Sequence, residues 1–276
     1  MLKRRTYLAA LCVAFAVAWA LLAINPHDRS DWLLENVLLV AFAAALLASH
    51  RALPLSRISY TTIFAFLLLH TIGAHYTYSL VPWQEWIHWL SGGAVAAPTA
   101  QRNHFDRLVH FFYGLLLAYP VREVFLRVAE LRGFWGYFFP LNVTLSTSVL
   151  YELAEWAAAE VFGGDLGVAF LGTQGDVWDA QKDMALAGAG ATIAMAITAA
   201  LNYALERDFA MEWIESLRVK HPAPLGEDEI RRLWLARKRG HAPGGAGGDS
   251  ASTDHPADRS GAAGKPPGRR RPGRDA

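Results

Sequence analysis

Residues 172–184 read GTQGDVWDAQKDM, and they lead into an apolar run, residues 184–205, that is long enough to cross a bilayer. Three carboxylates, Asp176, Asp179 and Asp183, stand at the mouth of this run at spacings of three and four residues. If the segment is helical, that spacing places all three on one face. Acidic side chains at the end of a span are costly unless they are paired, hydrated or bound to a cation. The stretch therefore predicts a membrane helix with a polar site beside it.

The rest of the chain has the composition of a membrane protein. Of its 276 residues, 53% are hydrophobic and only 18% are charged. Apolar runs of span length recur along the chain, and we predict six membrane spans. These are residues 6–24, 32–48, 58–74, 108–126, 138–161 and 184–205. The expected fold is all-α, a polytopic membrane helix bundle formed by residues 1–205.

The first run resembles a signal peptide, because basic residues 3–5 precede it and residues 18–20 read AWA. The apolar run continues past this point to Ile24, so we expect an uncleaved span. Cys12, inside this span, is the single cysteine of the sequence. One cysteine cannot form an intramolecular disulfide framework.

Basic residues predict the orientation of the bundle. They occur in residues 3–5, in the connection 49–57, in the region 122–132 and in the C-terminal tail. With six spans, all four regions fall on one side of the membrane. Because short cytoplasmic loops are enriched in Lys and Arg, we expect both termini in the cytoplasm.

Two regions outside the spans have their own character. Residues 82–90 place three tryptophans at helical spacing, which predicts a short interfacial helix or, alternatively, a plug over the bundle. Residues 206–239 predict amphipathic helices on the inner leaflet. Residues 240–276 are rich in Gly, Pro, Asp and Arg, and we predict a disordered tail with a basic end.

Ionisable side chains from four segments are predicted to meet at the outer level of the membrane. They are His75 after the third span, Asp106, Arg107 and His110 at the start of the fourth, Glu152 and Glu155 late in the fifth, and Asp176, Asp179, Lys182 and Asp183 at the sixth. Scattered charges would reach both ends of a six-span bundle, whereas these reach one.

Carboxylates and imidazoles together suit a divalent metal such as zinc, manganese, magnesium or iron. Glu and His pairs at i, i+3 or i, i+4 on facing helices are a usual way to build such a site in a bundle. The predicted ligands are His75, Asp106, His110, Glu152, Glu155, Asp176 and Asp179. We expect Asp183 beside the metal or acting as a general base, and Arg107 or Lys182 binding an anionic substrate. Such a site would suit metal-assisted hydrolysis or transfer on a lipid or envelope substrate.

Other interpretations stay open at this point. Glu152 and Glu155 would also suit a structural network with Arg107, Lys182 or His110. Asp176 would also suit a helix N-cap, with Asp179 in the first turn. The alternative functions are a small-solute or proton-coupled transporter and a structural membrane subunit. We expect membrane lipid as the partner and no nucleic acid.

Four segments together resemble a known family. They are HYTY at 75–78, NHFDR at 103–107 with His110 and Gly114, YELAEW at 151–156, and the segment at 172–184. Over about residues 5–205 the chain resembles the bacterial YjdF-like inner-membrane proteins, and it has a looser similarity to VanZ-like membrane proteins around the last span. The YjdF-like family is one of unknown function, so the resemblance implies a multi-span inner-membrane location and no particular activity.

Overall fold

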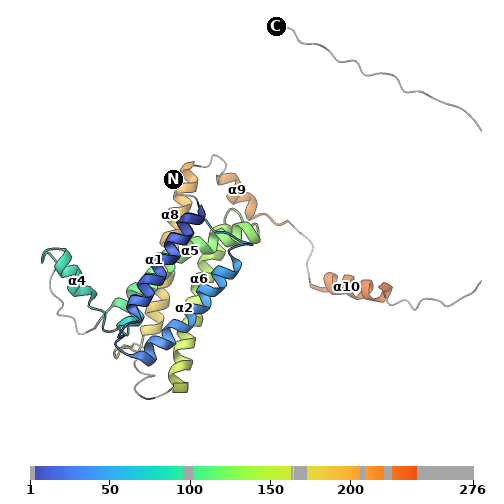
Figure 1. Cartoon of the computed structure of the whole chain (residues 1–276). Helices are drawn as coiled ribbons and strands as arrows, with labels where there is room; N and C mark the ends of the chain where they lie inside the picture. Colours follow the sequence, from blue (N-terminus) through green and yellow to red (C-terminus); the bar gives the residue numbers. More distant parts are fainter. Residues whose placement is uncertain are drawn as a thin grey trace, which may run out of the picture. The chain divides into compact units, whose positions relative to one another are not determined.

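The computed structural model describes residues 4–95, 102–162, 164, 173–205, 209–220 and 226–240. Every regular element in these ranges is a helix, which confirms the predicted all-α class (Figure 1). The chain divides into two units, residues 1–219 and 220–276, and the first unit holds the bundle.

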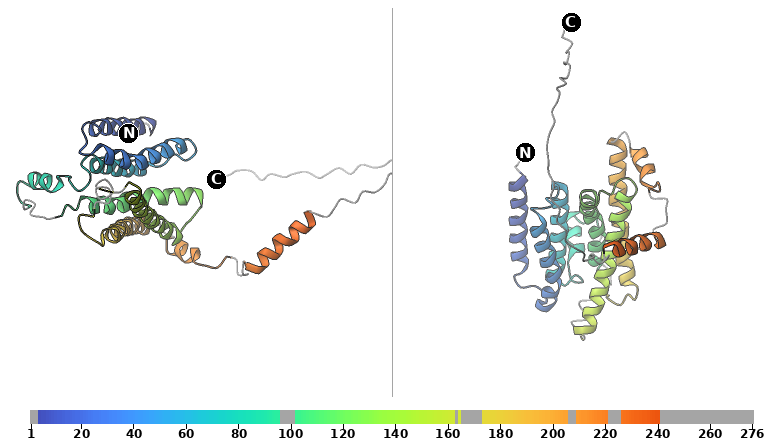
Figure 2. Two further views of the ribbon diagram at one scale, coloured as in Figure 1. Left: turned by 90° about the horizontal axis from the view of Figure 1, so that it is seen from below. Right: turned by 90° about the vertical axis from the view of Figure 1, so that its right-hand side faces the viewer.

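Six long helices overlap the six predicted spans. They are α1 (Arg4–Leu22), α2 (Arg29–Ser49), α3 (Arg57–His75), α5 (Phe105–Val128), α6 (Trp135–Phe162) and α8 (Asp179–Leu205). Among the described residues, all of these except α6 are both long and apolar enough to cross a membrane. Helix α6 has the length, at 28 residues, but its apolar character is interrupted by Asn142, Glu152 and Glu155. The long helices lie side by side in the bundle (Figure 2).

Polar residues cap the starts of two of the long helices. The Asp28 side chain caps α2 by accepting hydrogen bonds from the backbone N–H groups of Ser30 and Asp31, at 2.8 and 2.9 Å. Ser56 caps α3 in the same way, with its hydroxyl 3.1 Å from the backbone nitrogen of Ser59. Helix α5 continues through Pro120 to its end at Val128.

Helix α5 is central to the bundle, and it packs against α3, α6 and most extensively α8. Glycines allow this close approach. A Cβ atom at Gly114 would meet the backbone of Ala187 and Ala191, and one at Gly190 would lie 2.8 Å from the backbone nitrogen of Leu115. Small residues let membrane helices pack backbone to backbone. This contact fixes the register between α5 and α8.

Three short helices complete the described part of the chain. Helix α4 (Trp83–Leu90) has no buried residue, so it does not plug the bundle. Helix α9 (Phe209–Ser216) lies against the α5–α6 connection, where the Glu212 carboxylate accepts a hydrogen bond from the backbone N–H of Gly133 at 3.2 Å. Helix α10 (Gly226–Gly240) belongs to the second unit and has an amphipathic sequence. The predicted disordered tail lies outside the described residues from 241 onward.

Candidate functional site

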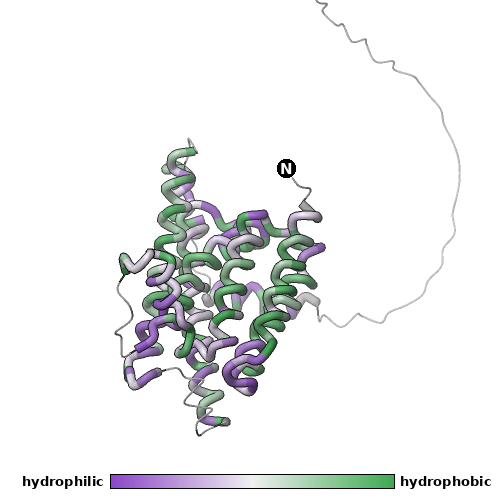
Figure 3. The backbone as a smooth tube through the Cα atoms, turned by 60° about the vertical axis from the view of Figure 1, so that its left-hand side comes forward, coloured by the Kyte–Doolittle hydropathy of each residue, from purple (hydrophilic) through white to green (hydrophobic). Residues whose placement is uncertain are grey.

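One end of the bundle, here called the polar end, is where α1, α3 and α6 end and α2, α5 and α8 begin. The tube in Figure 3 is green along the middle of the long helices and more purple towards their ends. The ends of α1 and α3 are joined there by His75, whose Nδ1 lies 2.8 Å from the Leu22 carbonyl oxygen. His75 is therefore engaged by backbone at the rim of the bundle.

The first turns of α5 and α8 bring three side chains into one cluster, called here the Asp–His–Asp cluster. Each of Asp106, His110 and Asp183 offers one ligand atom, and these atoms all lie within 4.8 Å of one another. Asp106 and His110 are one turn apart on α5, with His110 Nε2 3.6 Å from Asp106 Oδ1. Asp183 comes from α8 and is only 2% exposed. The sequence predicted the first two as ligands, whereas Asp183 was expected beside the metal or as a general base.

The contact between α5 and α8 explains how these residues meet. His110 lies one turn before Gly114, and Asp183 lies one turn before Ala187. Because Gly114 touches the backbone of Ala187, the preceding turn of each helix points its polar side chain across the same interface. The cluster is a consequence of the same register that packs the two helices.

Helix α6 adds two carboxylates at this level. Glu152 Oε1 lies 3.4 Å from His110 Nε2 but has no hydrogen-bond partner, and Glu155 is buried nearby. Asp183 Oδ1 is also buried without a hydrogen-bond partner. Buried polar atoms are normally satisfied, and each exception costs free energy. Among the described residues, Asp183 Oδ1 of α8 and Glu152 Oε1 of α6 are thus left as hydrogen-bond acceptors without a donor at the polar end.

Two other predicted ligands, Asp176 and Asp179, form an ion-pair network with basic side chains. Asp176 Oδ2 lies 2.5 Å from both Arg107 Nη2 and Lys182 Nζ, and Asp179 Oδ1 lies 3.1 Å from Arg107 Nη2. Arg102 also pairs with Asp179. The hydrogen bond from Lys182, followed by that from the backbone of Trp178, holds the pKa of Asp176 well below its ordinary value of 3.8. Their charges are already compensated, so they are poorer candidates for metal ligands.

The sequence analysis did not include Arg102 or Asn103 among the site residues. Arg102 donates to the Thr173 carbonyl oxygen as well as to Asp179. Beside it, Asn103 N donates to Gln174 Oε1 at 2.9 Å, and Gln174 Nε2 donates back to the Asn103 carbonyl at 3.0 Å. These bonds hold the segment before α8 over the start of α5.

Helix α2 contributes a carboxylate that the sequence analysis missed. Glu35 is buried, and its Oε2 accepts a hydrogen bond from the Tyr151 hydroxyl of α6 at 3.2 Å. The Glu35 carbonyl oxygen lies 3.2 Å from His70 Nε2, and the Tyr78 hydroxyl lies 2.5 Å from His70 Nδ1. Because a carbonyl only accepts, His70 carries its proton on Nε2 and accepts from Tyr78. Asp31 and Glu35 at i, i+4 in the second span were the available signal.

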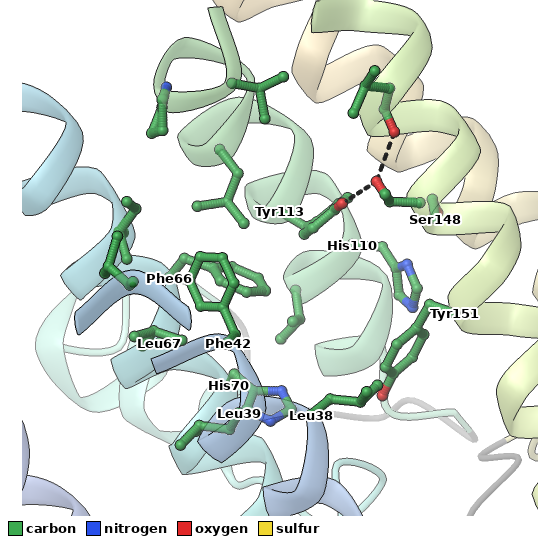
Figure 4. A pocket seen from close by; sticks show the side chains of 18 of the residues that line it. Leu38, Leu39, Phe42, Phe66, Leu67, His70, His110, Tyr113, Ser148 and Tyr151 are labelled. Atoms are coloured by element: carbon green, nitrogen blue, oxygen red, sulfur yellow. Dashed lines mark hydrogen bonds between the residues drawn. The ribbon is translucent and has the colours of Figure 1, made fainter. Parts of the chain in front are cut away.

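A cavity of about 440 Å³ begins at this polar end and extends between α2, α3, α5 and α6. Asp106 and His110 line its polar end, together with His70, Tyr78 and Tyr151. In Figure 4, Phe42 of α2 lies on the opposite side of the pocket from His110 and Tyr151. The cavity and the Asp–His–Asp cluster therefore share two residues.

Comparisons with known proteins match the chain to membrane proteins. The family described as "Predicted membrane protein (DUF2238)" matches residues 7–203. "Inner membrane protein YjdF" of Escherichia coli (strain K12) is 39% identical over 177 residues, which cover 62% of this chain and 79% of that protein. No solved structure matches the chain.

Proposed function

The chain belongs to the DUF2238 family of predicted membrane proteins, and we propose that this multi-pass inner-membrane protein binds one divalent metal ion at its polar end. The predicted YjdF-like family and inner-membrane location are confirmed by the comparisons. The metal and any activity are our proposal. The proposed ligands are Asp106, His110 and Asp183, with Glu152 beside them.

The observation that carries the proposal is the mutual approach of three ligand atoms from α5 and α8, all within 4.8 Å of one another. Two carboxylates and one imidazole are a donor set that suits zinc, manganese or iron. Ligand atoms about 2.1 Å from a zinc ion are at most about 4.2 Å apart, so the side chains need to close by only a small adjustment. The unpartnered oxygen of Asp183 is an acceptor that a cation would satisfy.

Electrostatics support a cation at this point. Five carboxylates, from Glu35, Asp106, Glu152, Glu155 and Asp183, are contributed to the polar end by four helices, and none of them forms a salt bridge to Lys or Arg in the described part of the chain. The described arginine and lysine residues nearest to them are engaged with Asp176 and Asp179. A divalent ion would relieve the repulsion among the five acids.

A divalent ion supplies Lewis-acid chemistry, because it polarises a phosphoryl or carbonyl oxygen and activates water. In the proposed reaction, hydrolysis or transfer on a lipid or envelope substrate, Glu152 takes the proton of the attacking group. Its Oε1 has no hydrogen-bond partner among the described residues and lies 3.4 Å from His110 Nε2, so it would be next to the proposed ligands and able to accept that proton. Arg107 would have to exchange its bond to Asp176 before it could bind an anionic substrate.

Two other functions fit fewer observations. Transport of a polar solute needs polar groups along the whole path, whereas the cavity is lined mainly by Leu, Phe and Val away from the polar end. A structural role accounts well for Asp176 and Asp179, which are paired with cations. It does not account for unpartnered buried oxygens on Asp183 and Glu152.

The test is metal analysis of the full-length protein purified in detergent and dialysed against zinc or manganese. We expect about one retained ion per chain, and a fall of at least about tenfold in Asp183→Asn and His110→Gln. The matched control is Glu123→Gln, because Glu123 is also a carboxylate of α5 but binds Ser56 and Ser59 at the opposite end of the bundle. A wild-type protein that retains no metal, or variants that retain as much as Glu123→Gln, would refute the proposal.

A further inference from the structure

We propose that the cavity binds one acyl chain of a membrane glycerophospholipid, whose ester and phosphate oxygens then lie at the Asp–His–Asp cluster. The placement of the lipid phosphate at the Asp–His–Asp cluster rests on the proposed metal site. The binding of the chain rests on the cavity itself, so the two can be tested separately.

The cavity follows one face of each of its helices. On α5 its lining runs from Asp106 to Val124 through Val109, Tyr113 and Leu117, all at helical spacing. Eighteen residues of helix correspond to about 27 Å, which is close to the roughly 30 Å thickness of the hydrocarbon core. A channel of this length along a membrane helix suits an extended hydrocarbon chain.

The lining changes from polar to apolar along the cavity, as a lipid does from its headgroup to its acyl chain. The acidic and imidazole side chains that line the cavity, those of His70, Asp106 and His110, lie at its polar end, where the spans begin or end. Beyond them the walls are mostly Leu, Val and Phe. The oxygen-rich headgroup of a lipid would contact the polar end, and its acyl chain would contact the apolar walls. A small polar ligand would not match the apolar walls.

The cavity has an edge that faces the surrounding membrane. Leu38 and Phe42 of α2 line it, and yet their side chains are 51% and 40% exposed. Within the bundle, α2 packs on α3 and is joined to α6 through the bond between Tyr151 and Glu35. The side between α2 and α6 is therefore where a chain would enter from the bilayer (Figure 4).

One polar atom in the wall supports an occupant rather than an empty gap. Ser148 lines the cavity and is 2% exposed, and its hydroxyl has no hydrogen-bond partner. Its neighbour Thr147 is satisfied by Tyr113 and by the Val143 carbonyl oxygen. A lipid ester carbonyl just beneath the cluster, at the depth of Ser148, would accept a hydrogen bond from this hydroxyl. At about 440 Å³ the cavity lies in the lower half of the range of about 300–1,000 Å³ typical of ligand pockets, which favours one chain over two.

The experiment uses the full chain in vesicles of phosphatidylethanolamine and phosphatidylglycerol that contain a phosphatidylglycerol with a diazirine in one acyl chain. After illumination, cross-linked residues are identified by peptide mass spectrometry, and metal content is measured on the same preparation. Lipid around the bundle reaches exposed side chains only. A chain inside the cavity reaches Leu39 and Leu117, which are 5% and 8% exposed.

Two matched pairs of variants separate a bound chain from surrounding lipid. Thr147 and Ser146 are neighbours on α6 and both are exposed, but only Thr147 lines the cavity, so Thr147→Trp places a large ring in it and Ser146→Trp does not. Leu38→Trp and Val37→Trp form the corresponding pair on α2 and serve if the first pair folds poorly. Overpacking costs about 1–3 kcal/mol, so cross-links to Leu39 and Leu117 should fall about tenfold in the cavity variants and stay unchanged in their controls.

The outcomes distinguish the two proposals. Equal labelling of Leu39 and Leu117 in Thr147→Trp and Ser146→Trp, or no labelling of either residue in the wild type, overturns the acyl-chain site. Labelling that depends on Thr147 in a protein that retains no metal supports the chain site and refutes the metal proposal. Retained metal in all variants with labelling lost only in the cavity variants supports both.

Discussion

The imidazole of His110 on α5 and the carboxylate of Asp183 on α8 lie within 4.8 Å of each other, one turn from the point where Gly114 meets the backbone of Ala187. The polar cluster and the closest helix contact are thus two consequences of one register. A change in that contact should alter the site without touching any of its side chains.

Replacing Gly190 by Ala tests this link. A Cβ atom there would meet the backbone of α5, so we expect a loss of about 1–3 kcal/mol in the free energy of unfolding and weaker metal retention. Gly188→Ala is the control on the same helix, because its Cβ would meet only the movable end of the Leu145 side chain, 2.7 Å away. Helix propensity favours both changes by up to about 1 kcal/mol, so Gly188→Ala should be neutral or stabilising. Equal unfolding curves for the two variants would contradict this account.

Tyr151→Phe should loosen α2. The change removes the donor to Glu35 and leaves a buried carboxylate oxygen without its partner, at a cost of about 1–3 kcal/mol. Hydrogen exchange of α2 should then become faster. Tyr113→Phe is the comparison, because Tyr113 bonds Thr147 between α5 and α6, which also pack directly on each other. The prediction is wrong if α2 exchanges equally fast in the two variants.

Asp176 should stabilise the protein in a pH-dependent manner. Its pKa is held low by Lys182, so its contribution is fully present above the ordinary value of 3.8 and is lost as the pH falls through the lower value in the folded state. The unfolding temperature of Asp176→Asn should therefore fall below that of the wild type at about pH 6, and the difference should shrink in strong acid. The exposed residue Glu160, changed to Gln, is the control. A difference that grows as the pH falls would contradict the assignment.

The orientation predicted from the basic residues has a direct test. In a Cys12→Ser background, Ser91→Cys lies on the same side as the polar end and Arg51→Cys lies in the α2–α3 connection. A membrane-impermeant thiol reagent should label Ser91→Cys in intact spheroplasts and Arg51→Cys only after lysis. The reverse pattern would place the cluster on the cytoplasmic side.

The sequence was sufficient for features that are local to one segment of the chain. The all-α class follows from the length and composition of the apolar runs. The pairing of Asp106 with His110 on one face follows from their spacing of four residues. Both are local properties of one helix, and they need no knowledge of its neighbours.

The sequence was insufficient where the rotation of one helix against another decides the contact. Asp176 was expected on one helical face with Asp179 and Asp183, but it lies in the turn segment before α8, which begins at Asp179. Of the two acids within α8, only Asp183 meets His110, because Gly114 and Gly190 set the rotation of α8 against α5. Asp176 and Asp179 meet cations, one of them Arg102 from a connection whose path the sequence does not specify. Glu35 was missed because a carboxylate in the first turns of a span looks like an interface residue.

The central claim is that Asp106, His110 and Asp183 hold a divalent ion, and zinc X-ray absorption on the zinc-loaded protein tests it most directly. The spectrum of the wild type should show oxygen ligands and one imidazole, with bond lengths of about 2.0–2.2 Å. In His110→Gln the imidazole contribution should disappear while any remaining zinc keeps oxygen ligands only. A wild-type protein without zinc, or an imidazole contribution that survives in His110→Gln, would contradict the claim.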